Sequence, residues 1–508
     1  MRSTLPFQVS DSYPLSDQNC SDEVSKPADS ESEKHDIFSS DSLDSTSNCR
    51  PEDPPIFNLP FEITAKIFAH YTAENSTPLD YPVRVRSTRS APLTLSAICR
   101  MWREIAFTTP QLWAAVNIFI SSFEQIPLLA ELASDYMHRS GNLPLTISIT
   151  NCVKLERLET RYERQVKWLF DVVRHFSARW CRLVLCIPPE LYVEFMGALW
   201  YTPILEDVRL TPVTGQDELR QVDFKLGGAP RLRHLELSKL FISRIKVPLE
   251  NLTSLEVSAV CVDEMLKLLK GANQLLSAKF SEILGNQVDF DFPWPPVPLT
   301  HHYLRHLDLR PDGNDYYTPV LTFLQSIIVP SLESFVYHGK DGISVDNILI
   351  LLNSSQIPVT KLEIVLIGAI AFEDSSFEED LVQLFRGTPA ITNLSISLLA
   401  EPLRKTVTDS FFALFGDPDF LPQLEVLSFT GWRGFSWAST RSLITTAKKR
   451  TVNMAVETEH DVSSPGYKPD PCLSTLLSLV AKNPSTTLNV VDYRTGKDMT
   501  RARLATDN

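Results

Sequence analysis

Apolar residues recur through most of the chain in a short motif, L-x-x-L-x-L, that often follows a proline. Clear copies occupy residues 203–210, 230–237 and 304–309. The first apolar positions of all copies are residues 205, 232, 252, 275, 304, 332, 359, 391 and 424, so successive copies lie 20 to 33 residues apart. A period of this length is typical of repeat proteins, in which each unit stacks on its neighbours to bury an apolar face that it cannot bury alone.

The residues that flank the second and third apolar positions of each copy are mostly polar. Side chains alternate between the two faces of a β-strand, so these flanking positions are expected to face away from the core. Across the nine copies only Val336, Val365 and Val426 are apolar at the flanks. The alternation predicts one short strand per copy, with one buried face and one polar face.

Apolar stripes with helical spacing lie between several copies and before the first one. We predict helices over residues 189–200, 262–270 and 377–386 between copies, and over 122–139 and 155–176 ahead of them. Residues 145–149 and 182–185 are candidate strands that precede the repeats. Strands that alternate with helices predict an α/β solenoid with a parallel strand in each repeat.

The N-terminal part of the chain has a different composition. Residues 1–50 hold 13 Ser and 10 acidic residues but only 4 Lys or Arg. Such a segment buries too little apolar surface to offset its ordering entropy, so we expect residues 1–53 to be a disordered acidic tail. A helical domain over 54–118, the solenoid over 119–494 and a polar tail over 495–508 complete the predicted organisation.

The predicted helical domain contains two helical patterns. Ile63, Ile67 and Phe68 form the first stripe, and residues 93–106 form the second. A domain of about 60 residues is small for an independent core. Its apolar residues therefore need cover, either from the rest of the chain or from a partner protein.

Charge and cysteine content restrict the function. The chain of 508 residues has 48 Lys and Arg against 62 Asp and Glu, a net charge of −14, which argues against binding to nucleic acid through overall charge. It shows no apolar run of about 20 residues and no signal peptide. Its eight cysteines have no metal-ligand spacing. We expect an intracellular protein, cytoplasmic or nuclear, with no membrane or nucleic-acid partner.

No enzyme motif stands out. The chain has no G-x-S-x-G, H-E-x-x-H, Walker loop or G-x-G-x-x-G sequence. The adjacent His301 and His302 lack a Cys, Asp or Glu at suitable spacing, so they are interpreted as loop residues. We expect no catalytic residue, no metal and no cofactor.

Several blocks between residues 59 and 113 resemble an F-box in content and order. They read Leu59-Pro60-x-Glu62-Ile63, Ile67-Phe68, Leu95-x3-Cys99-Arg100-x-Trp102-Arg103 and Thr109-Pro110-x-Leu112-Trp113. More narrowly, they resemble the F-box-like proteins expanded in mushroom-forming fungi, except that Thr64 stands where that family usually has Leu. The strand motifs resemble irregular leucine-rich repeats, with Leu240, Val260 and Ile283 among the residues at the usual asparagine position.

The resemblance implies a substrate-recognition adaptor of an SCF, or cullin-type, ubiquitin ligase. The partners would be the adaptor subunit, the cullin scaffold and an unknown target protein. The implied adaptor-subunit contacts are Leu59, Pro60, Ile63, Ile67, Phe68, Leu95, Cys99, Trp102, Leu112 and Trp113. The target-binding candidates on the repeat face are Arg209, His234, Glu236, Glu256, Lys279, His306, Asp308, Arg310 and His338.

An alternative is a non-ligase interaction scaffold in which the F-box-like hairpin is a structural cap. Repeat arrays need a cap to cover the apolar end of their core. The two hypotheses differ in whether the apolar side of residues 59–113 is free or is buried against residues 119–180.

Overall fold

The computed structural model describes thirteen segments of the chain. They are residues 59–75, 91–151, 160–196, 201–213, 222–284, 297–311, 318–339, 343–367, 376–399, 407–445, 449–457, 471–482 and 486–499. The predicted tail at residues 1–53 lies outside them. The residues from Pro60 onward belong to one compact unit, so the predicted helical domain is not a separate body from the repeats.

A 14-stranded sheet dominates this unit, and every neighbouring pair of strands is parallel. The strands follow one another in chain order, as a solenoid requires. They are β1 (Ala115–Ile120), β2 (Leu145–Asn151), β3 (Trp180–Cys186), β4 (Asp207–Leu210), β6 (His234–Ser238), β8 (Ser254–Cys261), β9 (Ser277–Leu284), β11 (His306–Pro311), β13 (Ser334–Gly339), β14 (Lys361–Leu366), β15 (Asn393–Leu398), β16 (Val426–Trp432), β17 (Arg450–Glu457) and β18 (Thr486–Asp492). Two small sheets pair β5 (Phe224–Lys225) with β7 (Ile245–Lys246) and β10 (Leu299–Thr300) with β12 (Ile327–Ile328).

All nine predicted strands are present and adjacent in the sheet. The copy that begins at Leu275 forms β9 and pairs with β8 on one side and β11 on the other. The burial pattern also follows the prediction, because buried and partly exposed residues alternate along strands such as β6 and β13.

The strands at both ends of the sheet were only partly anticipated. β1 begins at Ala115, so the sheet starts inside the segment assigned to the helical domain. β17 and β18 lack the L-x-x-L-x-L pattern but alternate in burial, and they complete the ladder. β17 extends to Glu457. Met499, expected in a polar tail, is buried, and its N–H donates to Val490 O at 2.8 Å.

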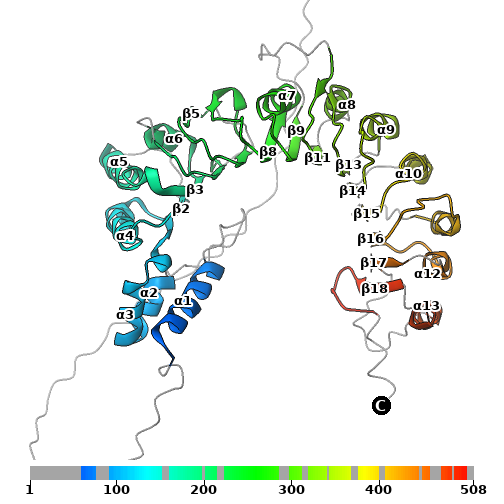
Figure 1. The fold of residues 1–508 in the computed structure, drawn as a ribbon, viewed down its shortest axis with the longest axis horizontal. Helices are drawn as coiled ribbons and strands as arrows, with labels where there is room; N and C mark the ends of the chain where they lie inside the picture. The colour runs from blue at the N-terminus through cyan, green and yellow to red at the C-terminus, as the bar shows by residue number, and fades with distance from the viewer. Residues whose placement is uncertain are drawn as a thin grey trace, which may run out of the picture. The chain divides into compact units, whose positions relative to one another are not determined.

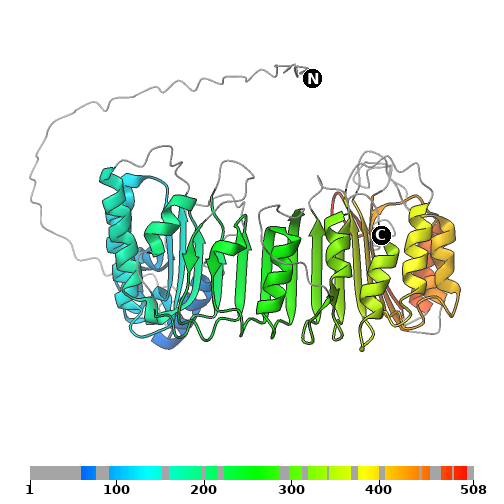
Figure 2. The same ribbon diagram turned by 90° about the horizontal axis from the view of Figure 1, so that it is seen from above.

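The helices from α4 onward lie on one face of the sheet, and we call the other face the open face (Figures 1 and 2). They are α4 (Ile126–Arg139), α5 (Thr160–Arg174), α6 (Pro189–Met196), α7 (Val262–Gly271), α8 (Thr318–Gln325), α9 (Val345–Asn353), α10 (Ser376–Arg386), α11 (Asp409–Ala413), α12 (Arg441–Thr445) and α13 (Pro471–Lys482). Short 3₁₀ turns supplement them: η2 (Pro110–Trp113), η3 (Phe123–Gln125), η4 (Ser177–Arg179), η5 (Ile242–Arg244) and η6 (Leu414–Gly416). A helix is about 10 Å wide, whereas neighbouring strands lie about 4.8 Å apart. Helices on one face therefore favour a bend of the sheet that makes this face convex.

Three helices precede the sheet: α1 (Phe61–Asn75), α2 (Ala91–Ile98) and α3 (Arg100–Thr108). The second predicted helix is therefore two helices that meet at Cys99. Cys99 has extended backbone, and its Sγ accepts a hydrogen bond from the Trp102 N–H at 3.4 Å. This N-cap ends one helix and begins the next. Thr64, the departure from the family pattern, is buried in α1.

A stack of left-handed residues occupies the strands where an asparagine ladder is missing. Lys239, Ala259 and Glu282 have φ values of 54°, 57° and 51°, and they occupy equivalent positions in three consecutive strands. The residues that follow them are Leu240, Val260 and Ile283, and all three are buried. Each left-handed residue is thus followed by a buried apolar side chain at the usual asparagine position.

Long polar side chains close the C-terminal ends of several helical segments. Arg179 donates to the carbonyl oxygens of Met137, in the last turn of α4, and of Leu143, just past its end, each at 3.0 Å. Arg450 is buried and donates to Phe415 O in η6 at 3.4 Å. His301 differs from its predicted loop role in that it is buried. Its Nε2 donates to Ala272 O at 2.9 Å, and its Nδ1 accepts from the Leu304 N–H at 3.2 Å.

Glu264 ties the start of α7 to the preceding repeat. Its side chain is buried, and its carboxylate accepts from the N–H of Ile242 at 2.8 Å and of Cys261 at 3.5 Å. Burial nevertheless dominates and raises the pKa of Glu264 to about 7. The folded state therefore holds the proton more tightly than the unfolded chain does.

We predict that Glu264→Gln removes one component of the pH dependence of stability. A raised carboxyl pKa stabilises the fold fully below the ordinary value of 4.5, and this contribution is lost as the pH rises through about 7. The variant should therefore gain stability relative to the parent between pH 4.5 and 8, by up to about 3 kcal/mol. Urea unfolding at several pH values measures the difference, with Glu124→Gln on the surface as the control. Parallel curves for parent and Glu264→Gln would contradict the prediction.

Candidate protein-binding surfaces

An exposed apolar stripe runs along α1. Ile63, Ile67 and Tyr71 follow one another at four-residue spacing, which places them on one helical face, and their exposed fractions are 43% to 44%. We call these three residues the α1 stripe. Of the twenty exposed large hydrophobic side chains among the described residues, eight lie between residues 59 and 107. Exposed apolar surface is therefore concentrated in the helices that precede the sheet.

Four of the ten predicted adaptor contacts are not at the surface. Phe68, Leu95, Leu112 and Trp113 are each at most 5% exposed. They belong to the continuous hydrophobic core that extends into the repeats. The expectation that these four side chains contact a partner is therefore corrected: their role is to hold the helices to each other and to the sheet.

The remaining predicted contacts are accessible to different degrees. Leu59, Pro60, Ile63 and Ile67 are exposed. Cys99 and Trp102 are partly buried, because Cys99 caps α3 and the Trp102 ring contacts Phe68 edge-on at 4.9 Å between centroids.

The structure adds exposed residues that the prediction omitted: Phe61, Tyr71, Leu93, Ile98 and Phe107. The four-residue spacing that links Ile63 and Ile67 extends to Tyr71, so this one could have been found in the sequence. The others depend on how the helices pack together.

Trp113 joins the first three helices to the solenoid. Its ring meets Tyr136 of α4 edge-on at 4.7 Å between centroids, and its Nε1 donates to Ala106 O in α3 at 2.7 Å. The Arg139 guanidinium lies over Phe107 at 4.3 Å and over Trp113 at 5.2 Å from the ring centroids. The apolar side of residues 59–113 is therefore partly free, along the α1 stripe, and partly buried against α4.

We predict that Trp113→Ala destabilises the protein by about 3–5 kcal/mol, since it leaves a large cavity between α3 and α4. Removal of Trp113 should also expose the α1–α3 region to proteolysis before the repeats. Thermal unfolding and limited proteolysis measure the two effects. Phe107→Ala, which truncates a 38% exposed ring in the same region, is the control and should have a smaller effect.

The nine predicted target-binding residues all lie on strands, at positions that alternate with buried apolar residues. The sheet register places Arg209, Glu236, Glu256, Lys279 and Asp308 side by side on five adjacent strands. His234 and His306 lie one row away along the strands, and Arg310 and His338 lie one row away in the other direction. The structure therefore gathers them on the open face, as predicted, although they come from six separate repeats.

Most charges in this part of the open face are paired with one another. Asp207 accepts from Arg182 at 2.7 Å and from Arg209 at 3.3 Å, and Arg209 also lies 3.3 Å from Glu236. Two further pairs are Lys279–Glu256 at 2.9 Å and Arg310–Asp308 at 2.7 Å. Burial raises the pKa of Glu236, and burial together with the charge of Arg310 lowers the pKa of His338. These side chains are thus partly desolvated by the sheet itself.

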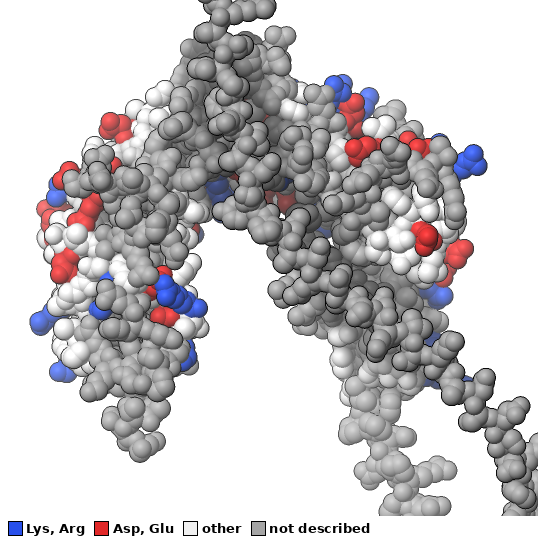
Figure 3. Space-filling view, turned by 180° about the vertical axis from the view of Figure 1, so that it is seen from behind, with Lys and Arg blue, Asp and Glu red and all other residues white. Residues whose placement is uncertain are grey.

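The last four strands present a different chemistry on the same face. Asn489 Nδ2 donates to Asn453 Oδ1 at 2.8 Å, and Asn453 Nδ2 donates to Ser428 Oγ at 3.4 Å. Elsewhere on the described surface, acidic and basic side chains are interspersed, as the view in Figure 3 shows.

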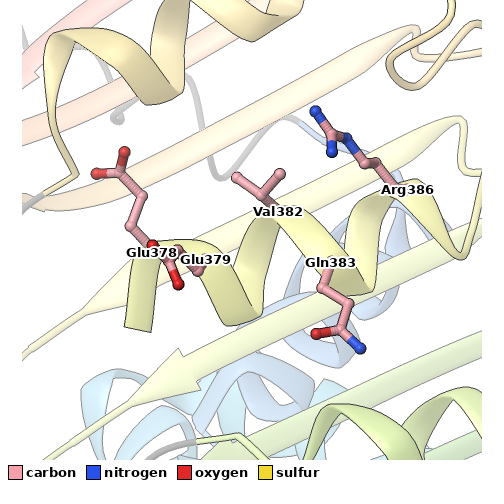
Figure 4. Close-up of a pocket in the computed structure, with 5 residues that line it drawn as sticks. All are labelled: Glu378, Glu379, Val382, Gln383 and Arg386. Atoms are coloured by element: carbon pink, nitrogen blue, oxygen red, sulfur yellow. The ribbon is translucent and has the colours of Figure 1, made fainter. Parts of the chain in front are cut away.

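The described residues contain little that resembles a catalytic centre. A shallow depression of about 330 Å³ is lined by five residues of one helix, α10: Glu378, Glu379, Val382, Gln383 and Arg386 (Figure 4). Glu378 is already engaged there, since its carboxylate accepts from the N–H and Oγ1 of Thr408, both at 2.8 Å. Within the described segments, no three His, Cys, Asp or Glu residues are placed to hold a metal ion.

Comparison with known proteins adds no assignment. No protein-family description matches the chain, and no curated protein matches it significantly. None of the helices in the described segments is long and apolar enough to cross a membrane.

Proposed function

We propose that this protein is a substrate-recognition adaptor of an SCF-type ubiquitin ligase. The α1 stripe would bind the adaptor subunit of the ligase, and the open face of the sheet would bind a target protein. The protein would act by tethering, because it raises the effective concentration of the target near a ubiquitin-charged enzyme without catalysing a reaction itself.

The observation that carries this proposal is the exposed α1 stripe. Soluble proteins seldom leave several large apolar side chains exposed together unless a partner covers them. Ile63 and Ile67 in the stripe are 43% and 44% exposed, although the adjacent side of α1, with Thr64 and Phe68, is buried. An amphipathic helix needs only one buried face, so the second apolar face of α1 favours an interface.

The attachment of the helices to the repeats supports the tethering role. Trp113 and Arg139 connect α3, η2 and α4 through ring and cation contacts. A docked partner would therefore be held in a defined position relative to the sheet, as an adaptor requires.

A second candidate is a non-ligase scaffold in which α1–α3 cap the first strand of the sheet. The burial of Leu112 and Trp113 against the start of the solenoid favours this alternative. The two candidates differ in the role of the α1 stripe, which a cap does not need to expose.

We predict that Ile63→Asp with Ile67→Asp abolishes binding of the SCF adaptor subunit, with at least about a 30-fold loss of affinity. Each exposed anchor that contributes as a hot spot is worth roughly 2 kcal/mol, and a charge in its place adds a desolvation cost. Titration calorimetry with the purified adaptor subunit and the full-length chain measures the change.

Leu128→Asp is the matched control, because Leu128 is a 58% exposed apolar residue on α4, outside the α1 stripe. This variant should bind like the parent. If the parent chain itself does not bind the adaptor subunit, the scaffold interpretation replaces the ligase proposal.

A further inference from the structure

The open face has two chemically distinct parts. From β3 to β14 every strand of the large sheet except β13 carries Arg, Lys, Asp or Glu, most of them in the ion pairs described above. From β15 to β18 the residues in the same alternation are Asn, Ser, Thr and apolar ones, with Glu457 as its single charged residue, because Arg450 and Asp492 of these strands are buried. Glu457 is paired with Arg494.

Large apolar side chains form one row at the carboxyl ends of these strands. The ladder aligns Ile367, Leu399, Trp432, Glu457 and Tyr493, because their strands remain paired to this point, so Glu457 stands between Trp432 and Tyr493. Ile367 is 48% exposed, Leu399 36% and Tyr493 48%, and Trp432 is partly exposed. We call these four apolar residues the apolar row. It crosses five strands, which at a strand spacing of about 4.8 Å is roughly 19 Å.

Removing water from this end of the open face also costs less free energy than removing it from the charged part. Covering the β4–β11 strands would remove water from charged side chains, which is costly even where they are paired. The open-face residues next to the apolar row are Val365, Ser397, Thr430, Ala455 and Val491, and in the row beyond them Asn489, Asn453 and Ser428 already hydrogen-bond to one another. A ligand can cover such groups with a smaller penalty, because satisfied polar groups need no new partner.

We propose that the apolar row anchors an uncharged peptide segment of the target protein through aromatic or aliphatic side chains. This inference rests on the proposed function in that it defines which segment of a target the adaptor recognises. A charged segment would place its charges against a surface whose one charged residue in the open-face alternation of β15–β18, Glu457, is already paired with Arg494. A second copy of the chain is disfavoured by size, since a standard interface uses about 20 residues on each side and the row has four.

The test is a selection from a phage-displayed library of random 12-residue peptides. The immobilised protein is the full-length chain carrying Ile63→Asp and Ile67→Asp, so that the α1 stripe does not select apolar peptides itself. Enriched peptides should lack charge and carry aromatic or aliphatic residues. Their affinity should fall at least about tenfold when Ile367→Ser and Leu399→Ser are added, as expected for truncated anchors.

The matched control replaces two isoleucines outside the row, Ile350→Ser and Ile357→Ser, which are 60% and 50% exposed. This control should bind the selected peptides like the parent. Tyr493→Ser provides a second row variant if the double substitution unfolds the protein, which circular dichroism would reveal.

Four results would overturn the inference. The selection could enrich charged peptides, or it could enrich no peptide more strongly on the parent than on the row variants. The selected peptides could bind the row variants as tightly as the parent, or sedimentation velocity could show a dimer that the row substitutions dissociate. Adaptor-subunit binding is measured separately on the parent chain. Failure of the proposed function is therefore distinguishable from failure of this inference.

Discussion

The parallel backbone ladder that joins the fourteen strands is the constraint on which the rest of this structure depends. Each short strand buries only two or three large side chains, too few to be stable alone, so stability comes from the continuous core that stacking creates. The ladder also aligns equivalent positions of the motif across the sheet. Arg209, Glu236, Glu256 and Lys279 are 70 residues apart from first to last, yet they occupy adjacent strands in one row. The chemistry of each row on the surface is therefore set by the residues at one position of the motif in successive repeats.

Left-handed residues in or just after three consecutive strands accompany this alignment, which has no asparagine ladder. Left-handed residues at Lys239, Ala259 and Glu282 redirect the chain at the same point in three repeats. Each left-handed non-glycine residue costs roughly 1–2 kcal/mol, and the buried residue that follows it offsets this cost. Arg179, His301 and Arg450 donate hydrogen bonds to carbonyl groups at the ends of helical segments. Side chains of different types therefore perform the same role in different repeats.

The two surfaces that we assign to partners differ in origin. The α1 stripe belongs to a single helix, so local spacing creates it, and its isolation from the core depends on Phe68 and Thr64 filling the adjacent side. The apolar row needs four separate segments of the chain and exists only when β14 to β18 are in register. Binding at the row should therefore be lost with any disruption of the C-terminal repeats, whereas the α1 stripe depends only on the first helices and their attachment through Trp113.

The sequence by itself determined the nine central strands, because the period-two alternation of apolar and polar residues has one stable solution, with the apolar side in the core. It also determined which charged residues share the open face. It did not determine which residues of 59–113 are buried, because Phe68, Leu112 and Trp113 have the same apolar character as Ile63 and Ile67. Only the packing of α3 and η2 against α4 separates the two sets. Likewise, β17 and β18 lack the repeat motif, and Trp432 and Tyr493 share a row with Ile367 and Leu399 only because parallel pairing brings distant strand ends together.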